Sequence, residues 1–370
     1  MNNIMMPVFR PTADCIWKSF RSSQKKHLVL TGSRGSGKTT LFHALFPAGT
    51  EGLTTWAVPG KGVYLKNNRT GETIQIGRFD PNLSGTENRM QPVLESFCEK
   101  GTSFFNFFLN SSEAWITIDE IGYLENHAYS YQNAVKKLLA HKHVLMVIRK
   151  QDLDFLNELQ NRSDVFAVDL DQPYGNAGCI IMASGQGTRF GGNKLLEAFH
   201  GKPLIQWALD ATAGLFSRRL VVTVHKEIEQ LCQKQAIPVL LHHLPFRNDV
   251  IRLGLEAIGN DVDRCAFLPS DQPLLKPESI CSLLLCAKNH PDFIWRPCYE
   301  ALPGSPVIFP ASFFEDLKTL PSKKGGNLII QEHPDAVKTV PASSLYELKD
   351  IDTQEDWQRM TQVPHCFFSL

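Results

Sequence analysis

Two glycine-rich segments of this 370-residue chain have the residue types that bind phosphate groups. The first covers residues 32–39 (GSRGSGKT) and the second covers residues 183–194 (ASGQGTRFGGNK). Each follows a short apolar run, residues 27–31 or 179–182, that is typical of a buried strand. Glycines let a backbone approach phosphates closely, and the lysine in each segment supplies positive charge. The chain therefore has two candidate nucleotide sites.

The first segment matches the pattern G-x-x-x-x-G-K-[ST] of a phosphate-binding loop between a strand and a helix. Its backbone N–H groups and the N-terminus of the following helix would hold the phosphates. Lys38 would reach the β- and γ-phosphates, and the hydroxyl of Thr39 would bind Mg²⁺. The residues expected to bind nucleotide here are Gly32, Gly35, Gly37, Lys38, Thr39 and Thr40.

Two adjacent carboxylates end another apolar run in the same half of the chain. Asp119 and Glu120 follow residues 115–118 (WITI). An acid in this position organises Mg²⁺ and its waters, so Asp119 is expected to be a metal ligand. Glu120 is placed to polarise an attacking water. A solvated strand end would explain the two acids equally well without the loop, but the loop favours Glu120 and Lys38 as catalytic residues.

Residues 119–125 (DEIGYLE) resemble the D-E-I-G-x-x-E signature of the small nucleoside-triphosphatase family first recognised in thermophiles. Residues 52–55 (GLTT) are similar to that family's G-F-x-T segment. The resemblance covers residues 27–170 and implies slow hydrolysis of ATP, GTP or related triphosphates. It departs at residues 56–58 (WAV), where the family has an acid followed by an arginine. Other arginines could stabilise the transition state, although each is expected to be an ordinary surface residue: Arg69, Arg78 and Arg149.

Residues 184–194 resemble the loop L-A-[AG]-G-x-x-x-R-[FM]-G-x-x-K of the MobA/MocA-like family, which attaches a nucleotide to molybdopterin. They are also similar to the wider sugar-nucleotide pyrophosphorylase superfamily. The resemblance implies that backbone amides at the glycines meet the triphosphate. Arg189 and Lys194 would neutralise the departing pyrophosphate. The residues expected to bind nucleotide are Ala183, Ser184, Gly185, Gly187, Arg189 and Lys194.

Three further segments follow in the order that this family has. Residues 265–273 (CAFLPSDQP) resemble a strand ending in G-D-Q-P, which makes Asp271 the expected catalytic residue and Mg²⁺ ligand. Residues 304–309 (GSPVIF) resemble the strand beside the acceptor. Residues 350–356 (DIDTQED) resemble the closing segment, where Asp352 is expected only to begin a helix. Four motifs in order over residues 178–360 form a specific signal.

The resemblance implies an in-line attack by a phosphate oxygen of molybdopterin on the α-phosphorus of CTP or GTP, with pyrophosphate leaving. Two segments depart from the pattern. Residues 322–326 (SKKGG) replace a G-D-x-G turn, so Lys323 and Lys324 add positive charge where the family has an acid. Residues 246–250 (FRNDV) replace a serine-rich segment. Gln272 and the A-S-G entry favour the cytidylyltransferase branch.

Three functions remain open from these residues. The first is a bifunctional protein of molybdenum cofactor maturation, with a molybdenum hydroxylase apoenzyme as a further hypothetical partner. The second is a nucleotide-switched assembly chaperone whose C-terminal half only binds the cofactor. The third is a nucleotidyltransferase acting on a sugar or alditol phosphate, against which the G-x-P-V-x-F and D-Q-P elements argue.

The composition excludes some classes of partner. The chain has 38 basic and 38 acidic residues, so there is no electrostatic case for binding nucleic acid or an anionic membrane. Its nine cysteines have no zinc-like spacing and are expected to be reduced thiols. No apolar run is long enough to span a bilayer, and we expect a cytoplasmic protein. His200, His242 and His243 are assigned no role.

Strand-like and helical segments alternate along the chain, which predicts an α/β protein with parallel sheets covered on both faces. With the resemblances, this implies a three-layer α/β/α P-loop NTPase domain followed by a Rossmann-like, GT-A-like nucleotidyltransferase domain. The expected parts are an extension (1–26), the NTPase domain (27–170), a linker (171–177), the transferase domain (178–363) and a tail (364–370). Expected elements that matter below include a helix at 13–20, a strand at 114–118 and a helix at 91–110.

Overall fold

The computed structural model describes residues 7–46, 50–83 and 89–364, and the chain divides into two compact units. Among the described residues, the N-terminal domain comprises those within 24–173, and the C-terminal domain comprises residues 174–364 together with residues 7–23. The expected extension, residues 1–26, is therefore mostly part of the C-terminal domain. Strand β9 (Ala177–Ala183) begins inside the expected linker. Residues 1–6 of the extension and all of the tail but Pro364 lie outside the described residues.

The N-terminal domain is built on a mixed sheet, eight-stranded among the described residues, in the order β5-β4-β3-β2-β6-β7-β1-β8. Strands β2, β6, β7, β1 and β8 are parallel, whereas β3, β4 and β5 extend the sheet in antiparallel fashion. The strands are β1 (His27–Thr31), β2 (Gly52–Val58), β3 (Gly62–Asn67), β4 (Thr73–Phe79), β5 (Met90–Pro92), β6 (Trp115–Ile121), β7 (His143–Ile148) and β8 (Val165–Asp169).

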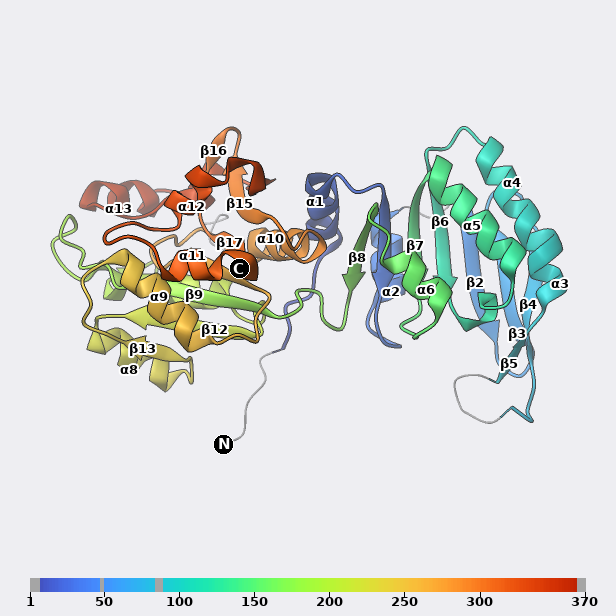
Figure 1. Ribbon diagram of the computed structural model, residues 1–370, viewed down its shortest axis with the longest axis horizontal. Helices are drawn as coiled ribbons and strands as arrows, with labels where there is room; N and C mark the ends of the chain where they lie inside the picture. Colours follow the sequence, from blue (N-terminus) through green and yellow to red (C-terminus); the bar gives the residue numbers. More distant parts are fainter. Residues whose placement is uncertain (1–6, 47–49, 84–88, 365–370) are drawn as a thin grey trace. The chain divides into compact units, whose positions relative to one another are not determined.

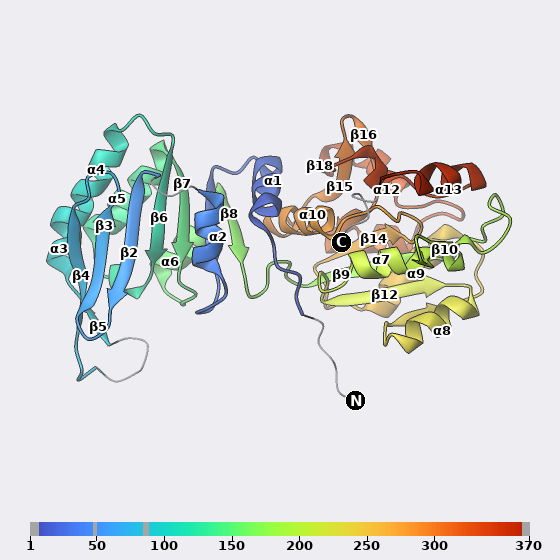
Figure 2. The same cartoon turned by 180° about the vertical axis from the view of Figure 1, so that it is seen from behind.

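Helices cover both faces of this sheet, as the three-layer expectation requires. In Figure 1, α4, α5 and α6 lie in front of the sheet, and Figure 2 shows α2 on the opposite face. Every residue of β1 is buried, which explains its uninterrupted apolar run. The helices are α2 (Lys38–Leu45), α3 (Leu94–Ser96), a π-helical turn (Phe97–Gly101), α4 (Thr102–Asn110), a 3-10 turn (Tyr123–Glu125), α5 (Tyr129–His141) and α6 (Asp154–Gln160).

The C-terminal domain has a second mixed sheet, with the order β13-β12-β9-β14-β17-β15-β16 and β18 beside β15. Strands β13, β12, β9 and β14 are parallel, and β17 then pairs antiparallel with β14 and β15. The strands after β9 are β12 (Arg218–Thr223), β13 (Val239–Leu241), β14 (Arg264–Pro269), β15 (Ile294–Tyr299), β16 (Leu302–Pro303), β17 (Val307–Pro310) and β18 (Val337–Pro341), with a separate pair β10 (Ala198–Phe199) and β11 (Lys202–Pro203).

Helix α9 lies in front of this sheet in Figure 1, and α7 lies on the other face, seen in Figure 2. Helix α1 packs against α10, and the hydroxyl of Ser19 donates to the carbonyl of Ser282. The helices are α1 (Ala13–Ser23), α7 (Leu204–Ala211), α8 (Lys226–Lys234), α9 (Arg247–Ile258), α10 (Pro277–Asn289), α11 (Phe314–Lys318), α12 (Asn327–Glu332) and α13 (Gln354–Thr361). The 3-10 turns are Lys194–Leu196, Ala311–Phe313, Pro334–Ala336 and Leu345–Leu348.

The structure corrects several expected elements. Each sheet has the expected parallel part, and antiparallel strands extend it. The strand expected at 114–118 continues to Ile121, because Ile121 still pairs with Ile148 of β7 across a register irregularity. The single helix expected at 91–110 is a short strand, β5, followed by α3, the π-helical turn and α4. Strand β2, which carries the GLTT segment, was not expected at all.

Candidate functional site

In the C-terminal domain the site lies at the carboxyl ends of two neighbouring strands, β9 and β14. From β9 the chain crosses to β12 and β13 on one side, and β14 then pairs with the other side of β9. Parallel α/β sheets bind ligands at such a switch point, outside the carboxyl ends of the strands. The loop over residues 184–194 follows β9, and Asp271 follows β14. The fold therefore brings the two expected elements to one place.

The glycine-rich loop after β9 closes on Gly187. The Gly187 carbonyl accepts hydrogen bonds from the N–H groups of Phe190 at 2.9 Å and Gly191 at 3.0 Å. Gly187 has a φ of +60°, and a Cβ added there would lie 1.8 Å from the carbonyl oxygen of Gly192. A side chain at this position would open the loop. Gly185, by contrast, has open space around it and lines the cavity described below.

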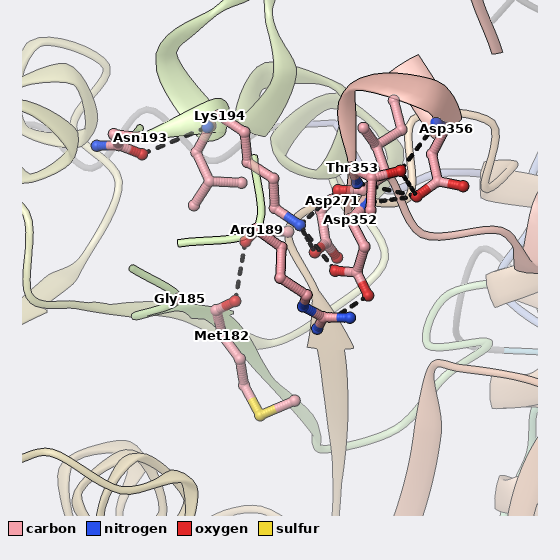
Figure 3. Close-up of polar contacts among 12 residues, drawn as sticks. Met182, Gly185, Arg189, Asn193, Lys194, Asp271, Asp352, Thr353 and Asp356 are labelled. Atoms are coloured by element: carbon pink, nitrogen blue, oxygen red, sulfur yellow. Dashed lines mark hydrogen bonds and ion pairs between the residues drawn. The ribbon is translucent and has the colours of Figure 1, made fainter. Parts of the chain in front are cut away.

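Lys194 is held by two carboxylates within this site (Figure 3). Its Nζ donates to Asp271 at 2.7 Å, to Asp352 at 3.1 Å and to the backbone carbonyl of Ile351. The side chain is only 9% exposed. Burial lowers the pKa of Lys194, but the neighbouring carboxylates outweigh burial, so the net shift is upward. The ammonium stays charged at the place where the departing pyrophosphate was expected.

Asp352 is part of the site, which corrects its interpretation as only the start of a helix. One of its carboxylate oxygens lies 3.1 Å from Nζ of Lys194, and the other lies 3.1 Å from the guanidinium of Arg189. The residue that caps α13 is Thr353, whose hydroxyl accepts from the N–H of Asp356 at 3.1 Å. The cap leaves the Asp352 side chain directed at the loop, as Figure 3 shows.

The carboxylates of Asp271, Asp350 and Asp352 lie at this edge of the sheet, and their proximity affects how a metal ion could bind. Burial and the charge of Asp271 raise the pKa of Asp350 to about 6. Within the described ranges, no group of three or more His, Cys, Asp or Glu side chains is arranged to hold a metal ion. Mg²⁺ commonly takes one or two carboxylates and completes its shell with phosphate oxygens and water. Asp271 and Asp352 fit an ion that is bound together with a nucleotide.

A cavity of about 620 Å³ opens beside these carboxylates. Its lining includes Arg189, Asp271, Asp350 and Asp352, together with Ser184 and Gly185. Three further cationic side chains and several apolar ones also line it. The cations are Arg247, Arg296 and Lys323, and the apolar residues are Phe309, Leu317 and Ile330. The cavity thus combines carboxylates for a metal with cations for an anion.

Arg247, Arg296 and Lys323, three of the four cations that line the cavity, have no carboxylate partner among the described residues. Arg296 donates from Nε to the carbonyl of Gly304 at 3.1 Å, and burial alone lowers its pKa. The ammonium of Lys323 lies 5.6 Å from the ring centre of Phe246. Arg247 packs against Gly325, where an added Cβ would lie 3.2 Å from its Cδ. The SKKGG segment that departs from the family pattern therefore lines the cavity and adds positive charge.

The phosphate-binding loop of the N-terminal domain joins β1 to α2, with α2 beginning at Lys38. Gly35 and Gly37 have φ values of +80° and +98°, which glycine adopts without strain. The Nζ of Lys38 donates to the carbonyls of Gly32 and Ser33, both at 2.7 Å. The side chain of Lys38 thus reaches back across the loop to its first residues, into the space where phosphates would bind.

Several of the residues expected to bind nucleotide lie close to Lys38 in the sequence. Thr39 and Thr40, in the first turn of α2, are exposed. Burial lowers the pKa of Lys38, and the nearby carboxylates of Glu120 and Asp171 oppose this shift. The charge of Glu120 is thus near enough to Lys38 to affect its pKa.

Asp119 and Glu120 lie at the irregular part of β6. Burial and the adjacent Glu120 raise the pKa of Asp119 to about 6, and His43 of α2 opposes the shift. His43 belongs to α2, the helix that also carries Thr39. Glu120 has a φ of +76°, an unusual backbone conformation for a residue with a side chain. Such conformations concentrate at functional sites.

Arg149 is the arginine that the structure brings to Glu120, which corrects its interpretation as an ordinary surface residue. The Nε of Arg149 forms an ion pair with the Glu120 carboxylate. Gly122 makes room for this contact, because an added Cβ would lie 2.8 Å from Cδ of Arg149. The side chains of Thr55 and Arg149 line the same small pocket. Arg69, in contrast, pairs with Glu51 and is 68% exposed.

Asp171 is a further residue of this site that the sequence did not reveal, because its segment resembled a linker. Its carboxylate accepts from the N–H and the hydroxyl of Ser33, both at 2.8 Å. Lys150 donates to both Asp169 and Asp171 at 2.9 Å. The pKa of Asp171 is lowered to about 2 by these hydrogen bonds, and the bond from Lys150 contributes most. The last residues of the N-terminal domain are thereby fastened to the phosphate-binding loop.

Comparison with known proteins bears on both domains. A family model described as an NTPase matches residues 27–174, and a model described as a MobA-like NTP transferase domain matches residues 179–337. No helix within the described ranges is long and apolar enough to cross a membrane.

Three relatives illustrate the similarity. A bifunctional protein GlmU from Rubrobacter xylanophilus is 30% identical over 110 residues, which is 28% of this chain and 24% of that protein. A 2-C-methyl-D-erythritol 4-phosphate cytidylyltransferase from Endomicrobium trichonymphae is 31% identical over 110 residues, 28% of this chain and 50% of that protein. A solved structure of molybdopterin-guanine dinucleotide biosynthesis protein A from Archaeoglobus fulgidus has 19% identity and a TM-score of 0.41, covering 50% of this chain and 97% of that one.

The matched stretches thus span a quarter to a half of the length of the curated relatives. The NTPase model matches the N-terminal domain, and the MobA-like model matches most of the C-terminal domain. The glycine-rich loop of each site lies inside the corresponding match. The chain therefore joins an NTPase domain to a MobA-like NTP transferase domain.

Proposed function

We propose that the protein is a bifunctional enzyme of molybdenum cofactor maturation. Its C-terminal domain transfers CMP or GMP from a nucleoside triphosphate to molybdopterin and releases pyrophosphate, and its N-terminal domain hydrolyses ATP or GTP. The observation that carries the transferase is the contact of Lys194 with both Asp271 and Asp352 at the switch point of the sheet. The match to the MobA-like transferase domain supports the same chemistry.

The proposed reaction is an in-line attack of an acceptor phosphate oxygen on the α-phosphorus of the nucleotide. The new bond joins the acceptor oxygen to phosphorus, and the bond to the bridging oxygen of pyrophosphate breaks. Arg189 and Lys194 neutralise the negative charge that the leaving pyrophosphate gains. Mg²⁺ held by Asp271 and Asp352 would stabilise the same charge. The protein otherwise acts by holding two anions in position.

The cations on the acceptor side of the cavity support an anionic acceptor. Arg247, Arg296 and Lys323 would hold a phosphate-bearing molecule, and the neighbouring Phe309 would contact an apolar or planar body. Molybdopterin has both features. The MobA-like match favours this acceptor over other phosphate monoesters.

The N-terminal domain is proposed to hydrolyse ATP or GTP with Lys38 on the phosphates, Thr39 and Asp119 as the residues that would hold Mg²⁺, and Glu120 polarising the attacking water. We further propose that this hydrolysis times the delivery of the nucleotide-modified cofactor to a molybdenum hydroxylase apoenzyme. The presence of both domains in one chain supports this coupling. A Lys38→Ala variant should keep transferase activity and lose efficient delivery; equal delivery by both proteins would remove the coupling.

An alternative acceptor is an alditol phosphate, since a relative at 31% identity is named as a 2-C-methyl-D-erythritol 4-phosphate cytidylyltransferase. A second alternative is a nucleotide-switched chaperone that binds cofactor without transferring to it. The unusual Lys323 in the cavity keeps that alternative open.

The identity of the product distinguishes these functions. The Lys38→Ala protein would be incubated with Mg²⁺ and with CTP or GTP labelled at the α-phosphate, and with molybdopterin or 2-C-methyl-D-erythritol 4-phosphate. We expect labelled CMP or GMP to be joined to molybdopterin. Label joined only to the alditol phosphate would establish the alternative acceptor, and nucleotide-dependent binding without any joined label would establish the chaperone.

A further inference from the structure

A buried histidine behind the nucleotide loop has a defined set of hydrogen bonds. His242 follows β13, is 6% exposed, and places Nε2 2.8 Å from the hydroxyl of Ser184, the first loop residue after β9. The N–H of Leu244 donates to Nδ1 of the same ring at 3.1 Å. Ser184 in turn donates its hydroxyl to the carbonyl of Val222 at 3.1 Å.

These contacts determine the tautomer of His242. A backbone N–H can only donate, so Nδ1 must accept and the ring proton lies on Nε2. Nε2–H then donates to the Ser184 oxygen, whose own proton is directed at Val222. Burial lowers the pKa of His242, with Asp249 opposing this and His243 adding to it, so the neutral ring is favoured. In this series of hydrogen bonds, from Leu244 through His242 and Ser184 to Val222, each donor thus has one acceptor.

The hydrogen-bonded chain joins the carboxyl ends of three strands. Ser184 follows β9, Val222 lies near the end of β12, and His242 follows β13. A second bond, from the hydroxyl of Thr223 to the carbonyl of Ala183 at 2.9 Å, fastens the same strand ends. Ser184 and Leu244, the two hydrogen-bond partners of the His242 ring, both line the 620 Å³ cavity.

We infer that His242 is a positioning residue that fixes Ser184 and the Leu244 segment as the nucleotide-side wall of the transferase cavity. The inference rests on the proposed function for the identity of the ligand, a nucleoside triphosphate. His242 touches no reacting atom. It acts because the loop residues that follow Ser184 must hold the triphosphate, and a loop that is free to shift at its first residue loses affinity for nucleotide. The binding of the acceptor, on the side of Arg296 and Lys323, is left unaltered.

The experiment measures equilibrium binding of labelled CTP and GTP to the full chain, in a Lys38→Ala background that removes phosphate binding by the N-terminal loop. Four variants are compared with this background: Ser184→Ala, His242→Ala, the double variant, and His243→Ala as the matched control. His243 is an exposed neighbour outside the cavity lining. Thermal unfolding of each variant reports whether the fold is intact.

We expect each single substitution to raise the Kd for nucleotide by about tenfold, the worth of one buried hydrogen bond. The double variant should show about the same loss as either single one, because residues that act as a unit are not additive. His243→Ala should leave the Kd unchanged. An unchanged Kd in Ser184→Ala, or additive losses in the double variant, would overturn the inference. If His242→Ala fails to fold, the Ser184→Ala result decides alone.

The kinetic readout separates this inference from the proposed function. With acceptor present, the KM for nucleotide should rise in the Ser184 and His242 variants while kcat and the KM for acceptor stay constant. If the background protein releases no pyrophosphate with any acceptor yet binds nucleotide, the proposed transfer fails. The Kd comparison then still tests the positioning role of His242.

Discussion

The ammonium of Lys194 lies 2.7 Å from the carboxylate of Asp271, although the two residues are 77 positions apart in the sequence. The contact arises because β9 and β14 are adjacent parallel strands, so the segments that follow them meet at one edge of the sheet. A lysine for the leaving pyrophosphate and an acid for a metal are thereby placed side by side by the topology of the sheet.

Asp352 should contribute to transfer, since it contacts both Lys194 and Arg189. An Asp352→Asn variant keeps the size of the side chain and removes its charge. We expect the kcat for pyrophosphate release to fall by about 100-fold, as for the loss of a charged group that acts on the transition state. Glu355→Gln is the control, because Glu355 is an exposed acid of α13 that pairs with Arg359 at the surface. Equal kcat values for the wild-type and Asp352→Asn proteins would return Asp352 to a purely structural role.

Arg149 should support hydrolysis by the N-terminal domain through its ion pair with Glu120. An Arg149→Ala variant should release orthophosphate from ATP or GTP roughly 10- to 100-fold more slowly, because the charge on the transition state loses a cation. Arg78→Ala is the control, since Arg78 is an exposed arginine of β4. If both variants keep the wild-type rate, the arginine that serves the transition state lies elsewhere.

Lys323 should select the acceptor. Replacing it by glutamine removes one of the three cations of the cavity that have no carboxylate partner, so the KM for an anionic acceptor should rise about tenfold while the KM for nucleotide stays constant. Lys324→Gln is the control, because this exposed neighbour does not line the cavity. If only the KM for nucleotide rises, Lys323 acts on the nucleotide and not on the acceptor, and the prediction is wrong.

Glu125 should make the stability of the N-terminal domain depend on pH. Burial raises its pKa from 4.5 to about 7, although the N–H of Gly122 donates to its carboxylate at 2.8 Å. A raised pKa in the folded state stabilises the fold below the unfolded-state pKa, and this contribution is lost as pH rises through about 7. The loss is on the order of 3 kcal/mol.

Calorimetry of the full chain between pH 5 and 8 tests this dependence. The transition of the N-terminal domain is identified as the one that Mg²⁺ and ATP shift in the wild type but not in Lys38→Ala. Its Tm should fall by several degrees as pH rises in the wild type and should fall less in Glu125→Gln. Parallel Tm profiles for the two proteins would show that Glu125 does not titrate in this range.

Local patterns predicted much of the fold. Strand β1 matches its expected bounds because a fully buried parallel strand is a continuous apolar run. The helix expected at 13–20 also forms, as α1, since its buried positions have helical spacing. Strand β2 escaped prediction because only part of it is buried: Trp56 is 38% exposed and stacks on Tyr64 of β3. That cross-strand aromatic pair was the available signal.

The candidate sites were predictable where a motif is local and escaped prediction where distant residues meet. The loop that contains Lys194 is one local segment, whereas the contact between Lys194 and Asp352 joins residues 158 positions apart. Arg149 and Asp171 are likewise brought to the N-terminal site by strand ends rather than by a motif. The position of α1 against α10 is a similar case, because only the buried face of α1, with Ile16 and Phe20, hinted at a partner.

The most direct test of the transferase is pyrophosphate release by the purified protein. The protein would be incubated with Mg²⁺ and each nucleoside triphosphate in turn, with and without molybdopterin, beside an Asp271→Ala variant. We expect release that depends on molybdopterin and on CTP or GTP, and that Asp271→Ala abolishes. Orthophosphate alone, in equal amounts from both proteins, would contradict the account and show that only the N-terminal domain is an enzyme.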